Sequence, residues 1–362
     1  MRGGAALAPP PRADPPPPRL LPAQLLFLPM EGVIVAPAEW RRGQPTLPRT
    51  ALAPIAALVE AALPAVWAEV AAAGATCRAD APAEVAALGA RLWDPAAAVL
   101  GAARTLPERI LPDRILPGWA ETGLRAEDAL PMLDLAASVL KGAKALWAVI
   151  VCDPPEAEGI RAALMPLLAA GTPAFRAGLA LLLAAASAPG TVAAAAAGID
   201  PRAASITEQA LDALLERCKV PVMAAETLSG AAAAVEGFAR LLEDLDTAPA
   251  SDRARRRAHL HALRREASAA CQSRFSAAMQ ENLLRPLTAG GDAAAMEEAA
   301  RTLRRLARAA GRIGDPLPYS RAITAVLAAI ARRPAGTTLM TAARLTEILS
   351  GPEAALALLD AG

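Results

Sequence analysis

Residues 290–314 read GGDAAAMEEAARTLRRLARAAGRIG, and this stretch decides the class of fold. Gly290 and Gly291 interrupt the chain, and Asp292 is a residue type that caps the first turn of a helix. The large apolar residues that follow recur at the spacing of one helical face: Met296, Leu303, Leu306, Ala310 and Ile313. The stretch therefore predicts a capped amphipathic helix, with its arginines on the remaining face.

The composition of the whole chain extends this prediction. Hydrophobic residues make up 54% of the 362 residues, but only 3% are aromatic. Much of the hydrophobic content is alanine, the best helix former, whereas the residues that favour strands are scarce. We therefore expect an all-α protein made of stacked antiparallel helix hairpins. The length predicts two domains or one long, solenoid-like array of helical repeats.

Proline divides the chain into regions. Of the 33 prolines, 25 precede Asp200 and eight follow it. Residues 1–19 are rich in proline and glycine and lack apolar periodicity, so we expect them to be disordered. Residues 20–50 read as an extended or irregular strap, residues 51–200 as a helical region punctuated by proline, and residues 201–362 as a helical region with longer helices.

Proline and capping patterns predict where several helices begin. Pro82, Pro95, Pro131 and Pro173 suit the first turns of helices, where a missing N–H costs nothing. Ser205-x-x-Glu208 has the pattern of a capping box before a further helix.

The tryptophans are almost evenly spaced. They lie at residues 40, 67, 93, 119 and 147, at intervals of 27, 26, 26 and 28 residues. Stacked helical units with one large anchor each would give this spacing, although the flanking residues do not resemble one another.

No motif predicts a catalytic, cofactor-binding or metal-binding residue. The chain has neither G-x-x-x-x-G-K-[ST] nor G-x-S-x-G, and no G-x-G-x-x-G follows a strand. The two histidines, His259 and His261, are two residues apart, which places them on nearly opposite sides of a helix. We therefore expect no cofactor and no metal, and an enzyme is the less favoured class.

Isolated residues that could carry chemistry have simpler interpretations. The four cysteines are far apart in sequence and fit small buried hydrophobic residues in a reducing compartment: Cys77, Cys152, Cys218 and Cys271. Three carboxylates follow the proline-rich segment 106–119, and we interpret them as lying on solvated helix faces: Glu121, Asp128 and Asp134. Dispersed carboxylates or arginines leave a helical-fold enzyme as an alternative.

Arginine supplies the candidate interaction surface. The net charge is +7 from Ser251 to Gly362 and −6 over the rest of the chain. Two arginine-rich stretches carry the selected residues: Arg253, Arg256, Arg257, Arg264 and Arg265 in the first, and Arg301, Arg304, Arg305 and Arg308 in the second. Nucleic-acid binding is a disfavoured alternative, because no aromatic residues are interleaved for base stacking.

The function predicted from these patterns is a non-enzymatic helical interaction or scaffold protein that binds another protein. The arginine-rich, lysine-poor composition is typical of a GC-rich, bacterial-type genome, and we expect a cytoplasmic location. The uncharged run Ala177–Ile199 is mostly alanine and is split by Pro189, so we interpret it as buried helix and expect no membrane span. The oligomeric state is not indicated.

Overall fold

The computed structural model describes residues 20–78, 81–103, 116–221, 224–250, 253–332 and 338–360. These residues are almost entirely helical, which confirms the all-α class. The predicted disordered segment 1–19 lies outside them. The chain divides into two compact units, Met1–Leu182 and Leu183–Gly362, so this division falls before the boundary at residue 200 that proline content suggested.

The first unit begins with short helical segments where we expected an extended or irregular strap. They are α1 (Pro22–Phe27) and η1 (Leu28–Val33), followed by the strands β1 (Ile34–Val35) and β2 (Leu47–Pro48). Pro22 occupies the first turn of α1, and the Gln24 side chain accepts a hydrogen bond from the Leu21 backbone N–H at 3.0 Å. Burial of Leu25 and Phe27 stabilises this turn, and only the parallel pair β1–β2 is extended.

Proline shapes the next helices differently from the prediction. They are α2 (Arg49–Ala62), α3 (Pro64–Gly74), α4 (Pro82–Ala103), η2 (Trp119–Thr122) and α6 (Ala126–Val151). Pro82 begins α4 as predicted, but Pro95 lies inside α4 and Pro131 lies inside α6. An interior proline costs roughly 3 kcal/mol. Burial of the apolar faces on both sides of each proline offsets this cost, so both helices continue.

The core of the first unit lies where α4 packs against α6. Trp93 of α4 is fully buried and stacks on Trp147 of α6, with ring centroids 5.8 Å apart. The indole N–H of Trp93 donates to the Leu25 backbone carbonyl at 2.9 Å. This hydrogen bond ties α1 to the helix pair and satisfies a polar group that would otherwise be buried alone.

Two glycines allow α6, α7 (Ala157–Ala170) and α8 (Thr172–Ala185) to meet closely. Leu167 of α7 is 1% exposed and lies against Gly142 of α6 and Gly178 of α8. A Cβ on Gly142 would lie 2.8 Å from Leu167 Cδ2, and a Cβ on Gly178 would overlap Leu167 Cδ1. Pro173 lies in the first turn of α8, as predicted.

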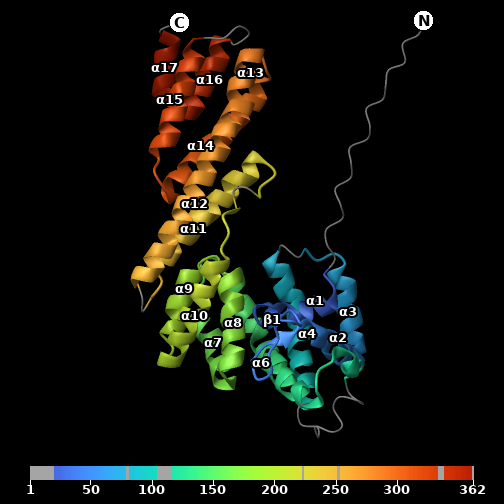
Figure 1. Cartoon of the computed structure of the whole chain (residues 1–362). Helices are drawn as coiled ribbons and strands as arrows, with labels where there is room; N and C mark the ends of the chain where they lie inside the picture. Colours follow the sequence, from blue (N-terminus) through green and yellow to red (C-terminus); the bar gives the residue numbers. More distant parts are fainter. Residues whose placement is uncertain are drawn as a thin grey trace, which may run out of the picture. The chain divides into compact units, whose positions relative to one another are not determined.

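The helices of the second unit range from 5 to 27 residues, whereas α4 and α6 of the first unit have 22 and 26, so the prediction of longer helices in the C-terminal region is wrong. The elements of the second unit are α9 (Pro189–Ala197), α10 (Pro201–Arg217), α11 (Leu228–Thr247), α12 (Arg253–Met279), the π-helical turn η4 (Gln280–Leu284), α13 (Arg285–Ala289), α14 (Ala293–Ile313), α15 (Leu317–Ala331), α16 (Leu339–Ser350) and α17 (Pro352–Asp360). The amphipathic α14 contacts α11, α12 and α16, and Figure 1 shows these elements together. The predicted stripe of α14 is buried, from Met296 to Ile313.

One predicted cap is confirmed and another is wrong. The Asp292 carboxylate accepts hydrogen bonds from the Ala294 and Ala295 N–H groups, both at 3.2 Å, at the start of α14. Ser205 does not cap α10, because that helix already begins at Pro201. Its cap is Asp200, which accepts from the Ala203 N–H at 2.7 Å.

The tryptophan spacing does not mark equivalent positions. Trp40 lies in the loop before β2, Trp67 in α3 and Trp119 in η2, whereas Trp93 and Trp147 lie within long helices. A solenoid-like arrangement therefore stays a prediction without support from these residues.

No described helix alone is both long enough and apolar enough to cross a bilayer. Taken together, α2 and α3 reach the length and apolar content of such a helix, but the pair is bent by 111° at the break between them.

The glycine contacts around Leu167 predict the effect of adding one methyl group. Gly178→Ala is expected to lower the free energy of unfolding by about 1–3 kcal/mol, because Leu167 is held by Gly142 on its other side. Gly101→Ala is the matched control: Gly101 lies in α4, and a Cβ there meets nothing within 4 Å. That control is expected to gain about 0.4–1 kcal/mol. Urea unfolding followed by circular dichroism measures both, and equal effects of the two substitutions would contradict this view of the contact.

Candidate functional site

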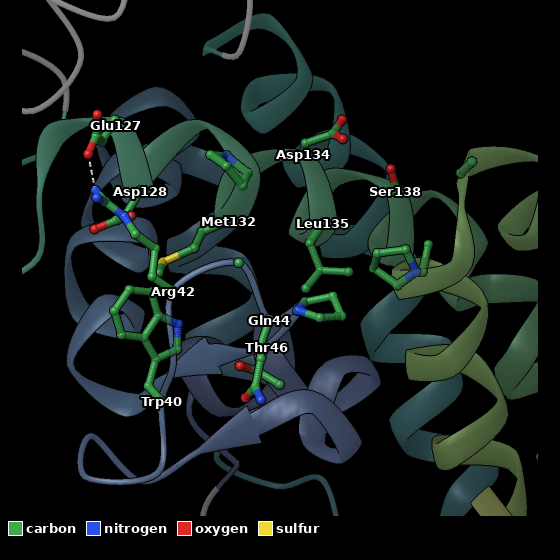
Figure 2. Close-up of a pocket in the computed structure, with 16 residues that line it drawn as sticks. Trp40, Arg42, Gln44, Thr46, Glu127, Asp128, Met132, Asp134, Leu135 and Ser138 are labelled. Atoms are coloured by element: carbon green, nitrogen blue, oxygen red, sulfur yellow. Dashed lines mark hydrogen bonds and ion pairs between the residues drawn. The ribbon is translucent and has the colours of Figure 1, made fainter. Parts of the chain in front are cut away.

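A cavity in the first unit has both polar and apolar residues in its lining. Its volume is about 610 Å³, within the range typical of small-molecule sites. One wall is the loop between β1 and β2, another is the first half of α6, and the end of α7 and the start of α8 complete it. Figure 2 shows Met132 and Leu135 of α6 pointing toward the side that carries Gln44 and Thr46.

Asp128 joins the loop to α6 at one end of the cavity. One carboxylate oxygen accepts from the Arg125 backbone N–H at 3.1 Å, which caps α6. The other accepts from Arg42 Nε at 2.9 Å, and Arg42 also pairs with Glu127 (Figure 2). The Arg42 hydrogen bond to Asp128, together with the two negative charges, raises the pKa of the Arg42 guanidinium. The loop is therefore held to α6 by a charged pair that is partly buried.

The loop wall also carries two polar atoms that have no hydrogen-bond partner among the residues that the structure describes. Trp40 Nε1 and Thr46 Oγ1 both line the cavity region and are covered by surrounding protein atoms. An unmet buried polar group costs about 1–3 kcal/mol.

The interpretation of Asp128 as a solvated carboxylate is wrong, because this residue is only 8% exposed. Its signal in the sequence is its position three residues after Arg125, where a carboxylate can cap a helix. Sequence reasoning missed Trp40 and Arg42, since they lie more than 80 residues before Asp128 and reach the same cavity only through tertiary packing.

A second site is an arginine-rich groove on α14 in the second unit. It consists of two hollows of about 340 and 440 Å³ that share Arg305 and Arg308. We call this groove, with its walls from α11 and α16, the arginine groove. Its arginines are Arg240 of α11, Arg344 of α16, and Arg301, Arg304, Arg305, Arg308 and Arg312 of α14. Arg240 and Arg344 were missed by sequence reasoning because each is isolated in its own stretch of sequence.

Ion pairs hold the two sides of the groove together. Arg305 donates to both carboxylate oxygens of Glu236 at 3.2 and 3.0 Å, and Arg312 donates to both oxygens of Glu243 at 2.9 and 2.5 Å. The hydrogen bond from Arg305 lowers the pKa of Glu236, and that from Arg312 lowers the pKa of Glu243. On the other side, Arg301 pairs with Glu297 and Glu298, and Arg344 pairs with Glu297 and Glu347.

Three guanidinium groups in the groove have no carboxylate partner among the described residues. Arg304 donates to the Ile348 backbone carbonyl at 2.6 Å, and Arg240 donates to the Glu236 backbone carbonyl at 3.4 Å. Arg308 lies where the two hollows join, and it donates to neither of these two backbone carbonyls. None of the three forms an ion pair with a described carboxylate, although the charge of Arg240 contributes to lowering the pKa of Glu236.

The five arginines predicted on α12 do not line the groove. Arg256 is 6% exposed and donates to the Pro249 carbonyl at 2.6 Å and to Asp212 at 3.1 Å. Arg264 pairs with Asp246 of α11. Arg253, Arg257 and Arg265 are exposed. The structure thus brings together the four predicted arginines of α14, and it gives two of those on α12 structural partners instead.

Histidine and cysteine define no further site among the described residues. No group of three or more His, Cys, Asp or Glu side chains there could hold a metal ion. The prediction that the cysteines are buried holds only for Cys271, whose burial raises the pKa of its thiol to about 11. Cys77 and Cys218 are partly exposed and Cys152 is exposed, because each lies beside a helix end.

Known proteins offer no model for either site. The chain matches no protein-family model, no curated protein and no solved structure.

The arginine–glutamate pairs predict how stability depends on pH. The folded pKa values of Glu236 and Glu243 lie below their unfolded values, so the pairs stabilise the fold above the unfolded pKa. This contribution is lost as the pH falls through the folded pKa values. Between about pH 6 and about pH 3, the wild type is therefore expected to lose more stability than the Glu236→Gln, Glu243→Gln double variant.

Urea unfolding at several pH values measures this difference. The matched control is the Glu281→Gln, Glu353→Gln double variant, which removes two exposed carboxylates outside the groove. It is expected to follow the wild type. If the two double variants had the same pH dependence of stability, the pairs Arg305–Glu236 and Arg312–Glu243 would not stabilise the fold as stated.

Proposed function

We propose that this chain is a non-enzymatic interaction protein that binds another protein by accepting an acidic segment in the arginine groove. The observation that carries the proposal is the group of three guanidiniums without carboxylate partners: Arg240, Arg304 and Arg308. Leaving such charges together is unfavourable unless solvent or a partner compensates them.

Guanidinium chemistry supports a carboxylate-bearing partner. An arginine side chain matches a carboxylate with two parallel hydrogen bonds, as Arg305 and Arg312 already do within the chain. Two or three Asp or Glu side chains of a short segment would meet Arg304, Arg308 and Arg240 in the same way. The two hollows provide a depression in which that segment can lie, in addition to the positive charge of the arginines.

The surroundings of the groove favour an acidic protein segment over nucleic acid. No aromatic side chain lines either hollow, so bases have nothing on which to stack. Glu236, Glu243, Glu297 and Glu347 lie around the arginines. These carboxylates would repel a long, evenly charged phosphate backbone, whereas a short segment can place its charges only where arginines are free.

Fluorescence anisotropy with a fluorescein-labelled peptide rich in Glu and Asp tests the proposal. Arg308→Ala is expected to weaken binding about tenfold, equivalent to about 1.4 kcal/mol. Arg265→Ala is the matched control, since it removes an exposed arginine of the same unit that lies outside the groove. This control is expected to bind like the wild type, and affinity is expected to fall as salt rises.

Two further ligands test whether binding is specific for the carboxylates of an acidic peptide. A peptide with Gln and Asn in place of Glu and Asp is expected not to bind. A single-stranded oligonucleotide of equal charge is expected to compete weakly. Stronger binding of the oligonucleotide than of the peptide, or equal losses in Arg308→Ala and Arg265→Ala, would overturn the proposal.

A further inference from the structure

A pocket in the second unit has a lining that is mostly aliphatic. Its volume is about 310 Å³, at the lower end of the range for small-molecule sites. The end of α8, the start of α9, the end of α10 and the second half of α11 surround it. Five leucines supply much of the lining: Leu183, Leu214, Leu215, Leu241 and Leu245.

The leucines of this pocket differ in their exposure to solvent. Leu183, Leu215 and Leu245 are buried, whereas Leu214 and Leu241 are partly exposed. The apolar surface of the two partly exposed leucines stays in contact with water. An alkyl chain that covers this surface would be held by the hydrophobic effect, so the pocket favours a ligand with an aliphatic body.

Arg217 gives the rim of the pocket its charge. This residue lies in the last turn of α10, is exposed and lines the pocket. Its Nε donates to the Ala213 backbone carbonyl at 3.1 Å, and no carboxylate in the described part of the chain forms an ion pair with it. Among the described residues, no Asp or Glu lines the pocket. The ionic charge that a ligand meets there is therefore positive.

The carboxylates at neighbouring positions have partners elsewhere. Asp244 of α11 accepts hydrogen bonds from backbone N–H groups in the first turn of α9. The carboxylate of Glu216, which precedes Arg217, lies 3.9 Å from the guanidinium of Arg255. Neither carboxylate therefore takes the place of a ligand at Arg217.

We propose that this pocket binds a medium-chain alkyl carboxylate. The alkyl chain lies against the leucines, and the carboxylate pairs with Arg217, whose guanidinium matches it with two parallel hydrogen bonds. This site goes beyond the arginine groove, because the pocket and the groove share no lining residue.

Cys218 is a built-in reporter of occupancy. Its side chain lines the same pocket and is partly exposed, so a ligand in the pocket shields the thiol. The full-length chain is treated with N-ethylmaleimide, and peptide mass spectrometry gives the alkylation rate of each cysteine. Octanoate is expected to slow the alkylation of Cys218 saturably. Cys152, an exposed cysteine of the first unit, is the internal control and is expected to react at an unchanged rate.

Ligands with the same chain and different head groups test the sign of the charge. Octanoate is expected to protect Cys218 at a concentration at least about tenfold lower than octan-1-ol or octylamine. Chain length tests the apolar part of the site. From butanoate to octanoate, affinity is expected to rise by up to about fourfold for each methylene that the pocket buries.

Matched charge variants separate ligand binding from a structural role, because a cation also suits the C-terminal end of α10. Arg217→Gln is expected to abolish the preference for octanoate over octan-1-ol. Lys219→Gln removes an exposed cation that does not line the pocket, and it is expected to keep the preference. Each rate is compared with that of the same variant without ligand. A purely structural role of Arg217 would change stability and leave the preference as in the wild type.

Two alanines at the end of α8 locate the binding. Both are exposed, but only Ala184 lines the pocket. Ala184→Phe is expected to weaken octanoate binding at least about tenfold, whereas Ala185→Phe has no effect. Arg308→Ala, in the arginine groove, is also expected to have none. Circular dichroism shows whether each variant is folded.

Four outcomes would overturn the proposal. They are the absence of saturable protection of Cys218, equal protection by octylamine, an unchanged head-group preference in Arg217→Gln, and equal effects of the two Phe substitutions. Each can occur whether or not the arginine groove binds an acidic segment, so the two proposals stand or fall separately.

Discussion

The insertion of Leu167 between Gly142 and Gly178 sets how closely α6, α7 and α8 approach one another. Because neither glycine has a Cβ, α6 and α8 both approach α7 at the same leucine. Alanine-rich helices bury little area per residue, so close approach is what gives them enough packing contacts. The cavity lies along α6 at the turns next to this contact, and its far wall is the junction of α7 and α8.

The second unit combines apolar packing with charge in a different way. The buried stripe of α14, from Met296 to Ile313, supplies the apolar contact with its neighbours. The pairs Arg305–Glu236 and Arg312–Glu243 then link α14 to α11 on the solvent side. Pairs that are this exposed contribute little stability each, so their main effect is to orient the side chains. They determine which arginines of the groove are neutralised and which are not.

The fold class and the sites differ in how far the sequence predicts them. Helical periodicity and the Asp292 cap are local properties, and both were predicted correctly for α14. The position of Pro95 inside α4 was not predicted, because burial of the helix outweighed the preference of proline for the first turn of a helix. The predicted arginines of α14, from Arg301 to Arg308, lie within about two turns of one another and share a surface. On α12, by contrast, Arg256 and Arg264 pair with residues of α10 and α11. The cavity is lined by segments more than 80 residues apart in the sequence, and no local sequence pattern predicts that they lie together.

The aromatic residues are divided between the two units. All five tryptophans, from Trp40 to Trp147, belong to the first unit, and the sequence of the second unit contains none. The single tyrosine, Tyr319, belongs to the second unit, where it is 2% exposed and meets Phe275 edge-on with ring centroids 5.2 Å apart. Intrinsic tryptophan emission from the intact chain is therefore a signal of the first unit alone.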